Sequence, residues 1–204
     1  MAMDTKLPFD PGTLTGISDK TIMIHADKLY QGYVKKKKEI QDKLAGLSAD
    51  DLTSANQSFS ALRALKDGET FSVNGVYLHE FYFSALGGAG EPTGALVEEI
   101  KKVYGWDQFV AAFSACGMAA RGWVILAWDT REGRLRIYTA DVHNQGGVWG
   151  CIPLLVLDVY EHAYFIDYGA DRKAYITDWW KNLNWSAADA IYTKVQGMKF
   201  DLPM

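Results

Sequence analysis

Cysteine is nearly absent from the sequence. Only Cys116 and Cys151 occur, and they do not form a Cys-x-x-Cys pair, so we expect neither a disulfide framework nor a cysteine-rich zinc site. Both should be reduced, buried thiols. No run approaches the roughly 20 apolar residues that span a bilayer, and the first ten residues lack the basic and then apolar pattern of a secretory signal. These absences predict a cytoplasmic protein with no membrane partner.

An excess of charge of one sign is also missing. The net charge of −4 and the pI near 5.6 provide no overall attraction for nucleic acid, so we expect no nucleic-acid partner. The basic run Lys35–Lys38 is interpreted as a solvated helix face. Aromatic residues are abundant, with 7 Trp, 11 Tyr and 9 Phe in 204 residues. A chain of this length and composition can bury a large core.

Helical spacing dominates the N-terminal part of the chain. Ser18 is a plausible N-cap for a long first helix, and a second helical region is expected from Leu52, interrupted around Asp67-Gly68 and resuming at Ser72. The glycine-rich segment 86–92 is the strongest break in composition. We therefore predict an N-terminal α-hairpin domain over residues 1–88 and a C-terminal domain over residues 89–204.

The C-terminal part changes from helical to extended character. Helices are expected over residues 93–104 and 107–119, and β-rich runs follow at residues 123–128, 135–139 and 153–157, the first two separated by a turn. Helices return after residue 162. The predicted fold class is α+β, with the helical hairpin followed by a small antiparallel sheet covered by helices.

The four histidines of the chain are the first candidates for chemistry. His25 and His79 lie on apolar stripes of the two long helices, so packing of those helices would place both imidazoles in one dry interface. Asp158 ends an apolar strand and His162 follows four residues later. One carboxylate with three imidazoles suits iron or manganese. The residues alone leave such a metal site and four separate structural side chains equally open.

Three segments resemble the metal-binding segments of iron/manganese superoxide dismutases in order and spacing: His25–Val34, Gly75–Tyr82 and Asp158–Tyr164. The likeness extends over nearly the whole chain. It implies that His25, His79, Asp158 and His162 ligate one iron or manganese ion per subunit. It further implies an enzyme that converts superoxide to oxygen and hydrogen peroxide.

The resemblance also implies roles for residues around the ligands. Tyr33 matches a tyrosine that lines the substrate funnel, and Glu161 matches a residue that reaches the ligand histidine of a partner subunit. Tyr164 matches an interface tyrosine, while Lys28 and Arg172 match basic residues associated with anion attraction and the dimer. The implied assembly is a homodimer or a homotetramer.

Several positions depart from the family pattern. Leu29 and Phe165 replace a polar pair at the funnel, which places proton delivery in question, and Tyr160 replaces a tryptophan in the pocket that also contains Trp123. These departures keep open an alternative, a non-enzymatic or weakly active metal-binding protein of the same fold.

The donor to the metal-bound solvent is also left open by the resemblance. Gln145 matches the manganese-type donor, but the segment from it to Asp158 is then short. His143 matches the histidine of some iron-type members and suits that spacing better. The choice between iron and manganese therefore stays open.

Overall fold

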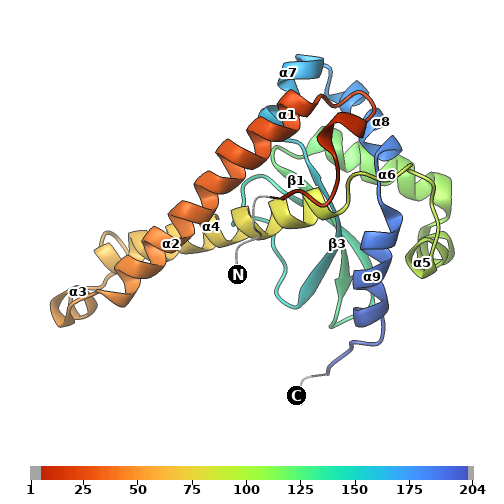
Figure 1. Cartoon of the computed structure of the whole chain (residues 1–204). Coiled ribbons are helices and arrows are strands. Elements are labelled where there is room, and N and C mark those ends of the chain that lie inside the picture. The colour runs from red at the N-terminus through yellow and green to blue at the C-terminus, as the bar shows by residue number, and fades with distance from the viewer. Residues whose placement is uncertain (1–5, 202–204) are drawn as a thin grey trace.

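The computed structural model describes residues 6–201. Two long helical segments form an arm that projects from a body built around a small β-sheet (Figure 1). A short turn, η1 (Pro11–Thr13), precedes α1 (Asp19–Ile24). The chain continues without a break through the π-helical turn η2 (His25–Tyr30) into α2 (Gln31–Ala45). After α3 (Ala49–Thr53) at the tip of the arm, α4 (Ala61–Ser84) returns antiparallel to α2 and reaches the body.

The caps of these helices are encoded locally. The Ser18 hydroxyl accepts a hydrogen bond from the Thr21 amide at 3.2 Å, which confirms the predicted helix start. The Ser60 hydroxyl accepts from the Arg63 amide in the same way at the start of α4. Each hydroxyl satisfies one of the amide groups that have no partner within the first turn of a helix.

Two local predictions need correction. The second helical region is interrupted at residues 54–60, between α3 and α4, and not at Asp67-Gly68, because α4 runs through both residues. A β-carbon on Gly68 would lie 3.1 Å from Cδ1 of Ile40 on α2, so the glycine allows the two helices to approach closely rather than ending one of them. Cys116 and Cys151 are unpaired, as expected, but they are half-buried rather than buried.

The body contains the predicted antiparallel sheet, so the α+β fold class is confirmed. Its strands are β1 (Trp123–Asp129), β2 (Arg134–Ala140) and β3 (Cys151–Asp158), in the spatial order β2-β1-β3. All seven residues of β1 are buried, as expected for a central strand covered on both faces. In the register of β1 with β3, Trp123 lies opposite Asp158 at one end of the sheet.

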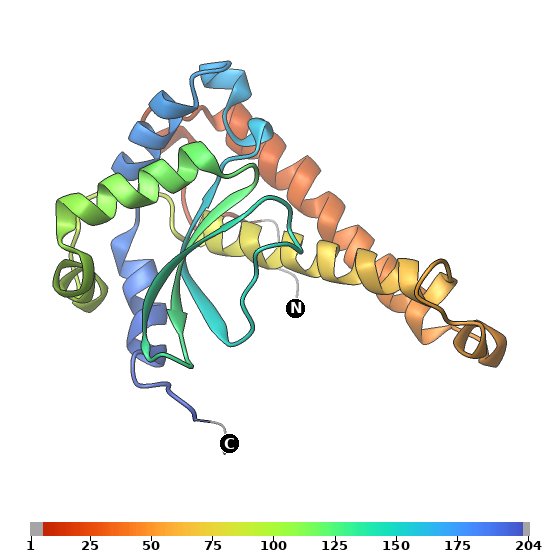
Figure 2. The ribbon, with the colours of Figure 1, turned by 180° about the vertical axis from the view of Figure 1, so that it is seen from behind.

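Helices cover the sheet, with α4 and α9 (Trp185–Val195) along β3 and α6 (Trp106–Ala119) across β1 and β2 (Figures 1 and 2). The body also contains α5 (Ala95–Tyr104), η3 (Glu161–Ala163), α7 (Phe165–Tyr168) and α8 (Arg172–Lys181). One continuous hydrophobic core joins the inner ends of the arm helices to the sheet. The proposed division at residues 88 and 89 stays a prediction.

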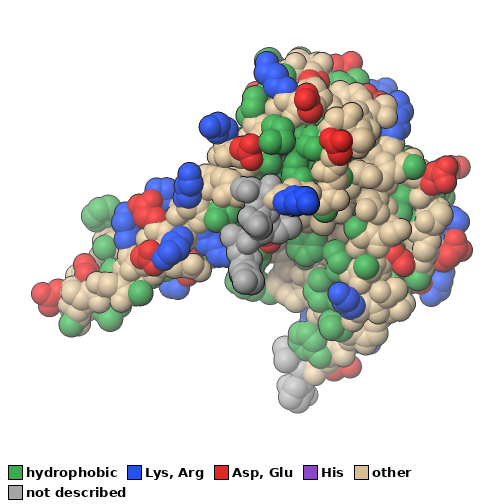
Figure 3. All heavy atoms as spheres, viewed as in Figure 1, with side chains coloured by type: hydrophobic (Ala, Val, Ile, Leu, Met, Phe, Trp, Pro, Cys, Tyr) green, Lys and Arg blue, Asp and Glu red, His purple; other side chains and the backbone are tan. Residues whose placement is uncertain are grey.

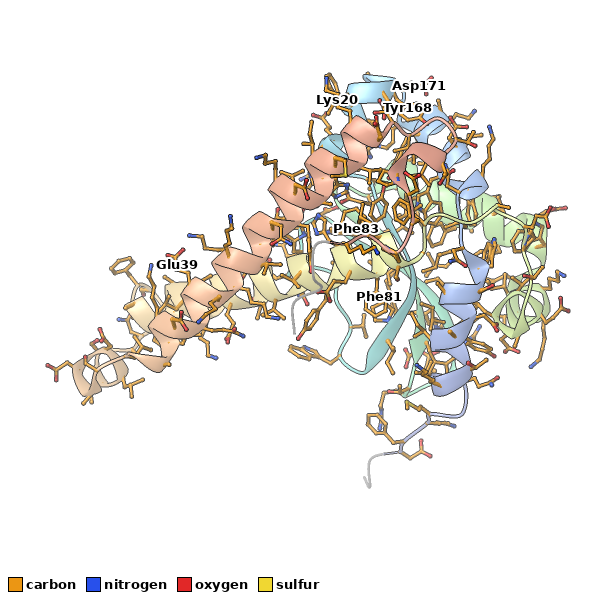
Figure 4. The ribbon with its side chains drawn as sticks, in the orientation of Figure 1. Lys20, Glu39, Phe81, Phe83, Tyr168 and Asp171 are labelled. Carbon is orange, nitrogen blue, oxygen red and sulfur yellow. The ribbon has the colours of Figure 1, made fainter. Side chains whose placement is uncertain are left out.

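The surface of the arm carries charges of both signs. Figure 3 shows basic and acidic side chains mixed along the arm. On α2, Lys36 pairs with Glu39 and Lys38 with Asp42. These pairs are exposed, and Figure 4 shows Glu39 on the outside of the arm. The basic run is therefore a solvated helix face, as predicted. Within residues 6–201, no helix combines the length and the apolar character needed to cross a membrane.

Candidate metal centre

Four side chains from four different elements converge where the arm meets the body. They are His25 at the start of η2, His79 on α4, Asp158 at the end of β3 and His162 in η3. One donor atom from each lies within 4.8 Å of all the others. Oδ2 of Asp158 is 3.2 Å from Nε2 of His25, 3.8 Å from Nε2 of His79 and 3.2 Å from Nε2 of His162. The structure therefore brings together all four residues that the sequence suggested as ligands.

Three of the four side chains are shielded from solvent. The side chains of His25, His79 and Asp158 are fully buried, and that of His162 is 25% exposed. Ligand atoms about 2 Å from a shared ion lie up to about 4 Å apart. The observed spread of 4.8 Å is close to that requirement. His162 is the ligand candidate nearest to solvent.

Hydrogen bonding fixes which nitrogen of His79 faces the centre. Its Nδ1 lies 2.5 Å from the carbonyl oxygen of Gly75, one turn earlier on α4. A carbonyl only accepts hydrogen bonds, so Nδ1 carries the proton. Burial lowers the pKa of His79 to about 3, which keeps the ring neutral. Its Nε2 therefore presents a lone pair toward Asp158, as a metal-ligating imidazole does.

Three buried nitrogen atoms of this cluster lack hydrogen-bond partners. Nε2 of His79 and both ring nitrogens of His25 make no hydrogen bond, because the 3.2 Å approach of His25 to Asp158 does not have hydrogen-bond geometry. A lone pair that faces a carboxylate oxygen is repelled, and an unpartnered buried nitrogen costs about 1–3 kcal/mol. A cation between these atoms removes both penalties. The residues present therefore fit a metal ion held by three nitrogens and one oxygen.

The charge states of the four groups agree with this arrangement. Burial acts to raise the pKa of Asp158, but His162 and His25 hold it well below its usual range, so the carboxylate is ionised. Burial lowers the pKa of His25. Burial also acts to lower the pKa of His162, but Asp158 raises it above its ordinary value. One buried negative charge thus faces the neutral imidazoles of His25 and His79, an arrangement that favours a cation.

An aromatic shell surrounds the exposed side of the centre. The rings of Tyr33 on α2 and His143 after β2 are 4.6 Å apart, and Tyr33 lies 5.3 Å from the ring of His79. Tyr160, which is half-buried, stacks on His162 at 5.3 Å. A β-carbon on Gly75 would lie 2.9 Å from Cδ1 of Tyr33. The glycine therefore lets Tyr33 approach α4 closely.

Trp123 determines the hydrogen-bonding state of His143. The indole Nε1–H of Trp123 donates to Nδ1 of His143 at 3.0 Å. Burial lowers the pKa of His143 to about 4, so the ring is neutral with its proton on Nε2. His143 is 3% exposed. Gln145 is exposed, and its backbone N–H donates to the carbonyl of Val142. Of the two candidate donors, only His143 belongs to the buried aromatic shell.

The remaining predicted residues lie in η2, in η3 and in the segment that follows η3. Glu161 and Lys28 are exposed. Tyr164 is 3% exposed, and its hydroxyl accepts a hydrogen bond from Nε of Arg172 at 3.1 Å. The same Arg172 side chain donates to the Ala120 carbonyl just after α6. Arg172 therefore links α6 to the segment that follows His162, and its donors are directed inward rather than toward solvent.

Three residues beside the centre were not anticipated from the sequence. Phe71 lies 4.5 Å from the ring of His143, and Tyr82 lies 5.2 Å from the ring of His25. The hydroxyl of Tyr175, on α8, hydrogen-bonds to the backbone of Asp158. The position of Tyr82, three residues after His79 on the same helix face, could have indicated it. No pattern in the sequence connects Tyr175 to the ligands.

Comparison with known proteins gives consistent results. The family described as iron/manganese superoxide dismutases, C-terminal domain, matches residues 92–191. The superoxide dismutase [Fe] of Aquifex pyrophilus is 43% identical over 195 residues, which cover 94% of this chain and 92% of the relative. The superoxide dismutase [Fe] of Aquifex aeolicus is 44% identical over 187 residues, covering 90% and 88%. A superoxide dismutase [Mn] of Halobacterium salinarum is 33% identical over 183 residues, covering 88% of each chain.

Proposed function

The chain belongs to the iron/manganese superoxide dismutase family, and we propose that it is a superoxide dismutase that uses one iron or manganese ion per subunit. The ion would supply a one-electron couple, so that one superoxide is oxidised to oxygen and a second, with two protons, is reduced to hydrogen peroxide. The task of the protein is to hold the ion, tune it and deliver protons.

The observation that carries this proposal is the convergence of three imidazole nitrogens on one buried carboxylate oxygen. Nε2 of His79 has a lone pair and no hydrogen bond, and both nitrogens of His25 are unpartnered. Structural side chains in a core are almost always paired. A bound cation explains these three unpartnered nitrogens beside an ionised carboxylate, so we assign His25, His79, Asp158 and His162 as its ligands.

We assign His143, rather than Gln145, as the protein donor in the reaction space. Trp123 holds Nδ1 of His143 as an acceptor, which leaves Nε2–H as a fixed donor beside the ligands. Such a donor tunes a metal centre through its hydrogen bonds. Tyr33 is half-buried and lies next to His143, so its hydroxyl is a candidate proton source for the reacting oxygen.

We also propose that the active assembly is a homodimer formed around η3. Glu161 is exposed there, and the neighbouring apolar side chains of Phe165 and Ile166 are 55% and 45% exposed. Met23 and Ile24 on α1, which packs beside η3, are 44% and 37% exposed. Exposed apolar residues gathered on one surface are typical of a protein interface. In such a dimer Glu161 would be positioned to reach the partner's His162.

A cytoplasmic location is part of the same proposal. Cys116 and Cys151 are unpaired thiols, and free thiols persist in reducing compartments. Fractionation of the producing cells, with a reporter of known location as reference, would test it. Recovery of the protein outside the cytoplasm would contradict it.

The function is tested by metal analysis combined with a superoxide-consumption assay on the purified full chain. Asp158→Asn should lose both the metal and the activity, because it removes the single negative charge of the centre. Asp129→Asn is the matched control: Asp129 is also a buried aspartate at the end of a strand, 5% exposed, but it accepts hydrogen bonds from the following turn. The control should retain metal. Stoichiometric metal without activity in the unaltered protein would instead support the non-enzymatic alternative.

A further inference from the structure

The hydroxyl of Tyr175 makes a hydrogen bond that reaches the backbone of a ligand. Tyr175 lies on α8, is fully buried and donates to the carbonyl oxygen of Asp158 at 2.8 Å. A carbonyl oxygen only accepts, so the Tyr175 proton is committed to this bond. Because α8 lies outside the sheet, this contact connects the end of β3 to a helix that provides no ligand.

The sheet itself does not satisfy this carbonyl. The amide of Val159 donates to the Gly122 carbonyl across the ladder at 2.8 Å. Antiparallel pairs alternate between hydrogen-bonded and non-hydrogen-bonded, so the next pair, Trp123 with Asp158, is non-hydrogen-bonded. The Asp158 carbonyl therefore points away from β1, along the free edge of β3. Tyr175 supplies the donor that the sheet lacks there.

A second tyrosine extends the same chain of hydrogen bonds. The hydroxyl oxygens of Tyr82 and Tyr175 are 3.2 Å apart, and both residues are fully buried. Since the Tyr175 proton is used on Asp158, its oxygen must accept from Tyr82. Tyr82 lies on α4 three residues after His79, and its ring is 5.2 Å from that of His25. The chain thus runs from the ligand-bearing helix α4, through α8, to the ligand-bearing strand β3.

The other contacts of Asp158 show why its backbone position matters. Oδ1 accepts a hydrogen bond from the Tyr160 amide at 2.9 Å, and Oδ2 faces the three imidazoles. The carboxylate is therefore oriented by its own backbone and by the amide two residues later. If the carbonyl of Asp158 shifts, the peptide unit that carries this arrangement shifts with it. Metal ligands depend in this way on the groups that hold them.

We propose that Tyr175 and Tyr82 are positioning residues of the metal centre, which fix the end of β3 against α4 and thereby set the metal affinity and the reduction potential. This inference rests on the proposed function, because it takes Asp158 as a ligand. Neither tyrosine touches substrate. Loss of the Tyr175 hydroxyl should have the larger effect, because it leaves two buried groups unpaired, the Asp158 carbonyl and the Tyr82 hydroxyl. Loss of the Tyr82 hydroxyl leaves the bond from Tyr175 to Asp158 intact.

The test compares three tyrosine-to-phenylalanine variants. Tyr175→Phe and Tyr82→Phe remove the hydroxyls of the chain. Tyr168→Phe is the control, because the ring of Tyr168, labelled in Figure 4, lies 5.8 Å from that of Tyr175 but its hydroxyl donates to Asp178 at 2.9 Å and to no ligand. Each variant is purified, stripped of metal and titrated with manganese against a chelator of known affinity. The reduction potential of the reloaded protein and its thermal stability are measured in parallel.

Tyr175→Phe should bind manganese about 10- to 100-fold more weakly, the range typical for groups that support metal ligands, and should shift the reduction potential. Tyr82→Phe should show a smaller change in manganese affinity and reduction potential, in the same direction. If Tyr175→Phe does not fold, the comparison of Tyr82→Phe with the control still tests the proposal. Tyr168→Phe should lose stability only. Unaltered manganese affinity and unaltered reduction potential in both Tyr175→Phe and Tyr82→Phe would overturn the proposal. Failure of the unaltered protein to bind metal would refute the proposed function instead.

Discussion

Trp123→Phe tests the link between the sheet and the chemistry of the centre. The substitution keeps an aromatic ring on β1 but removes the indole N–H that donates to Nδ1 of His143 at 3.0 Å. His143 is 3% exposed, so water cannot readily replace this donor. The ring is then free to move its proton to Nδ1, which leaves Nε2 without one. The fixed donor beside the ligands is lost while all four ligands remain.

The expected loss of stability in Trp123→Phe follows from the burial of Trp123 and His143. An unsatisfied buried acceptor costs about 1–3 kcal/mol of stability, and the smaller ring adds a cavity term of similar size. Activity per bound metal ion should fall about 10- to 100-fold, as is typical for groups that support a metal centre. Two effects are therefore expected, one on stability and one on catalysis.

Trp128→Phe separates these two effects. Trp128 lies on the same strand, is 5% exposed and donates its indole N–H to the carbonyl of Met198 at 2.9 Å, remote from the ligands. It should lose similar stability in chemical denaturation but keep its activity per metal ion. Nitrogen NMR of the metal-free proteins would report the tautomer of His143 directly. Equal activities per metal ion in the two variants, or an unchanged His143 tautomer in Trp123→Phe, would refute the reasoning.

Further predictions concern packing, pH and metal removal. Gly75→Ala should lower activity, because the new β-carbon would lie 2.9 Å from Cδ1 of Tyr33 and displace that ring. Its melting temperature should be preserved, because the gain in helix propensity of about 1 kcal/mol offsets the strain. Turnover equal to that of the unaltered protein would contradict this. Burial lowers the pKa of His79 to about 3 and also lowers that of His25, so the unfolded state binds more protons below pH 6.5. Urea titrations of the metal-free protein should therefore show stability falling as the pH drops from 6.5 toward 3, by up to about 1.4 kcal/mol per pH unit for each of these histidines. His162, whose pKa is raised, changes the stability at pH values above 6.5 instead. Removal of the metal should lower the melting temperature, and metal at 100 times its dissociation constant should restore about 2.7 kcal/mol; identical melting curves would show that no ion binds the native centre.

Local signals identified most of the helices and strands. A hydroxyl N-cap such as Ser18 satisfies amides within three residues, so a helix start can be recognised from neighbours alone. The same holds for the buried run of β1, whose apolar character reflects its central place in the sheet. Gly68 shows the limit of such reasoning. Its role is to admit Ile40 of another helix, and no local pattern distinguishes this from a helix break.

The candidate site, too, was only partly predictable from local sequence. Spacing placed His25 and His79 on apolar helix faces and placed Asp158 and His162 at a strand end, but spacing does not determine whether the four donor groups face one point. That convergence depends on how η2, α4 and β3 pack, which is a property of the whole core.

The sequence by itself determined the α+β class, the order of the elements and the residue types able to hold an ion, because these depend on periodicity, caps and side-chain chemistry. Only the tertiary structure decided that His143 and not Gln145 joins the buried shell, since that depends on a hydrogen bond from Trp123, twenty residues away. It likewise decided that Tyr175 supports Asp158. Contacts between distant segments are set by the packing of the folded chain, and the local sequence around each residue does not encode them.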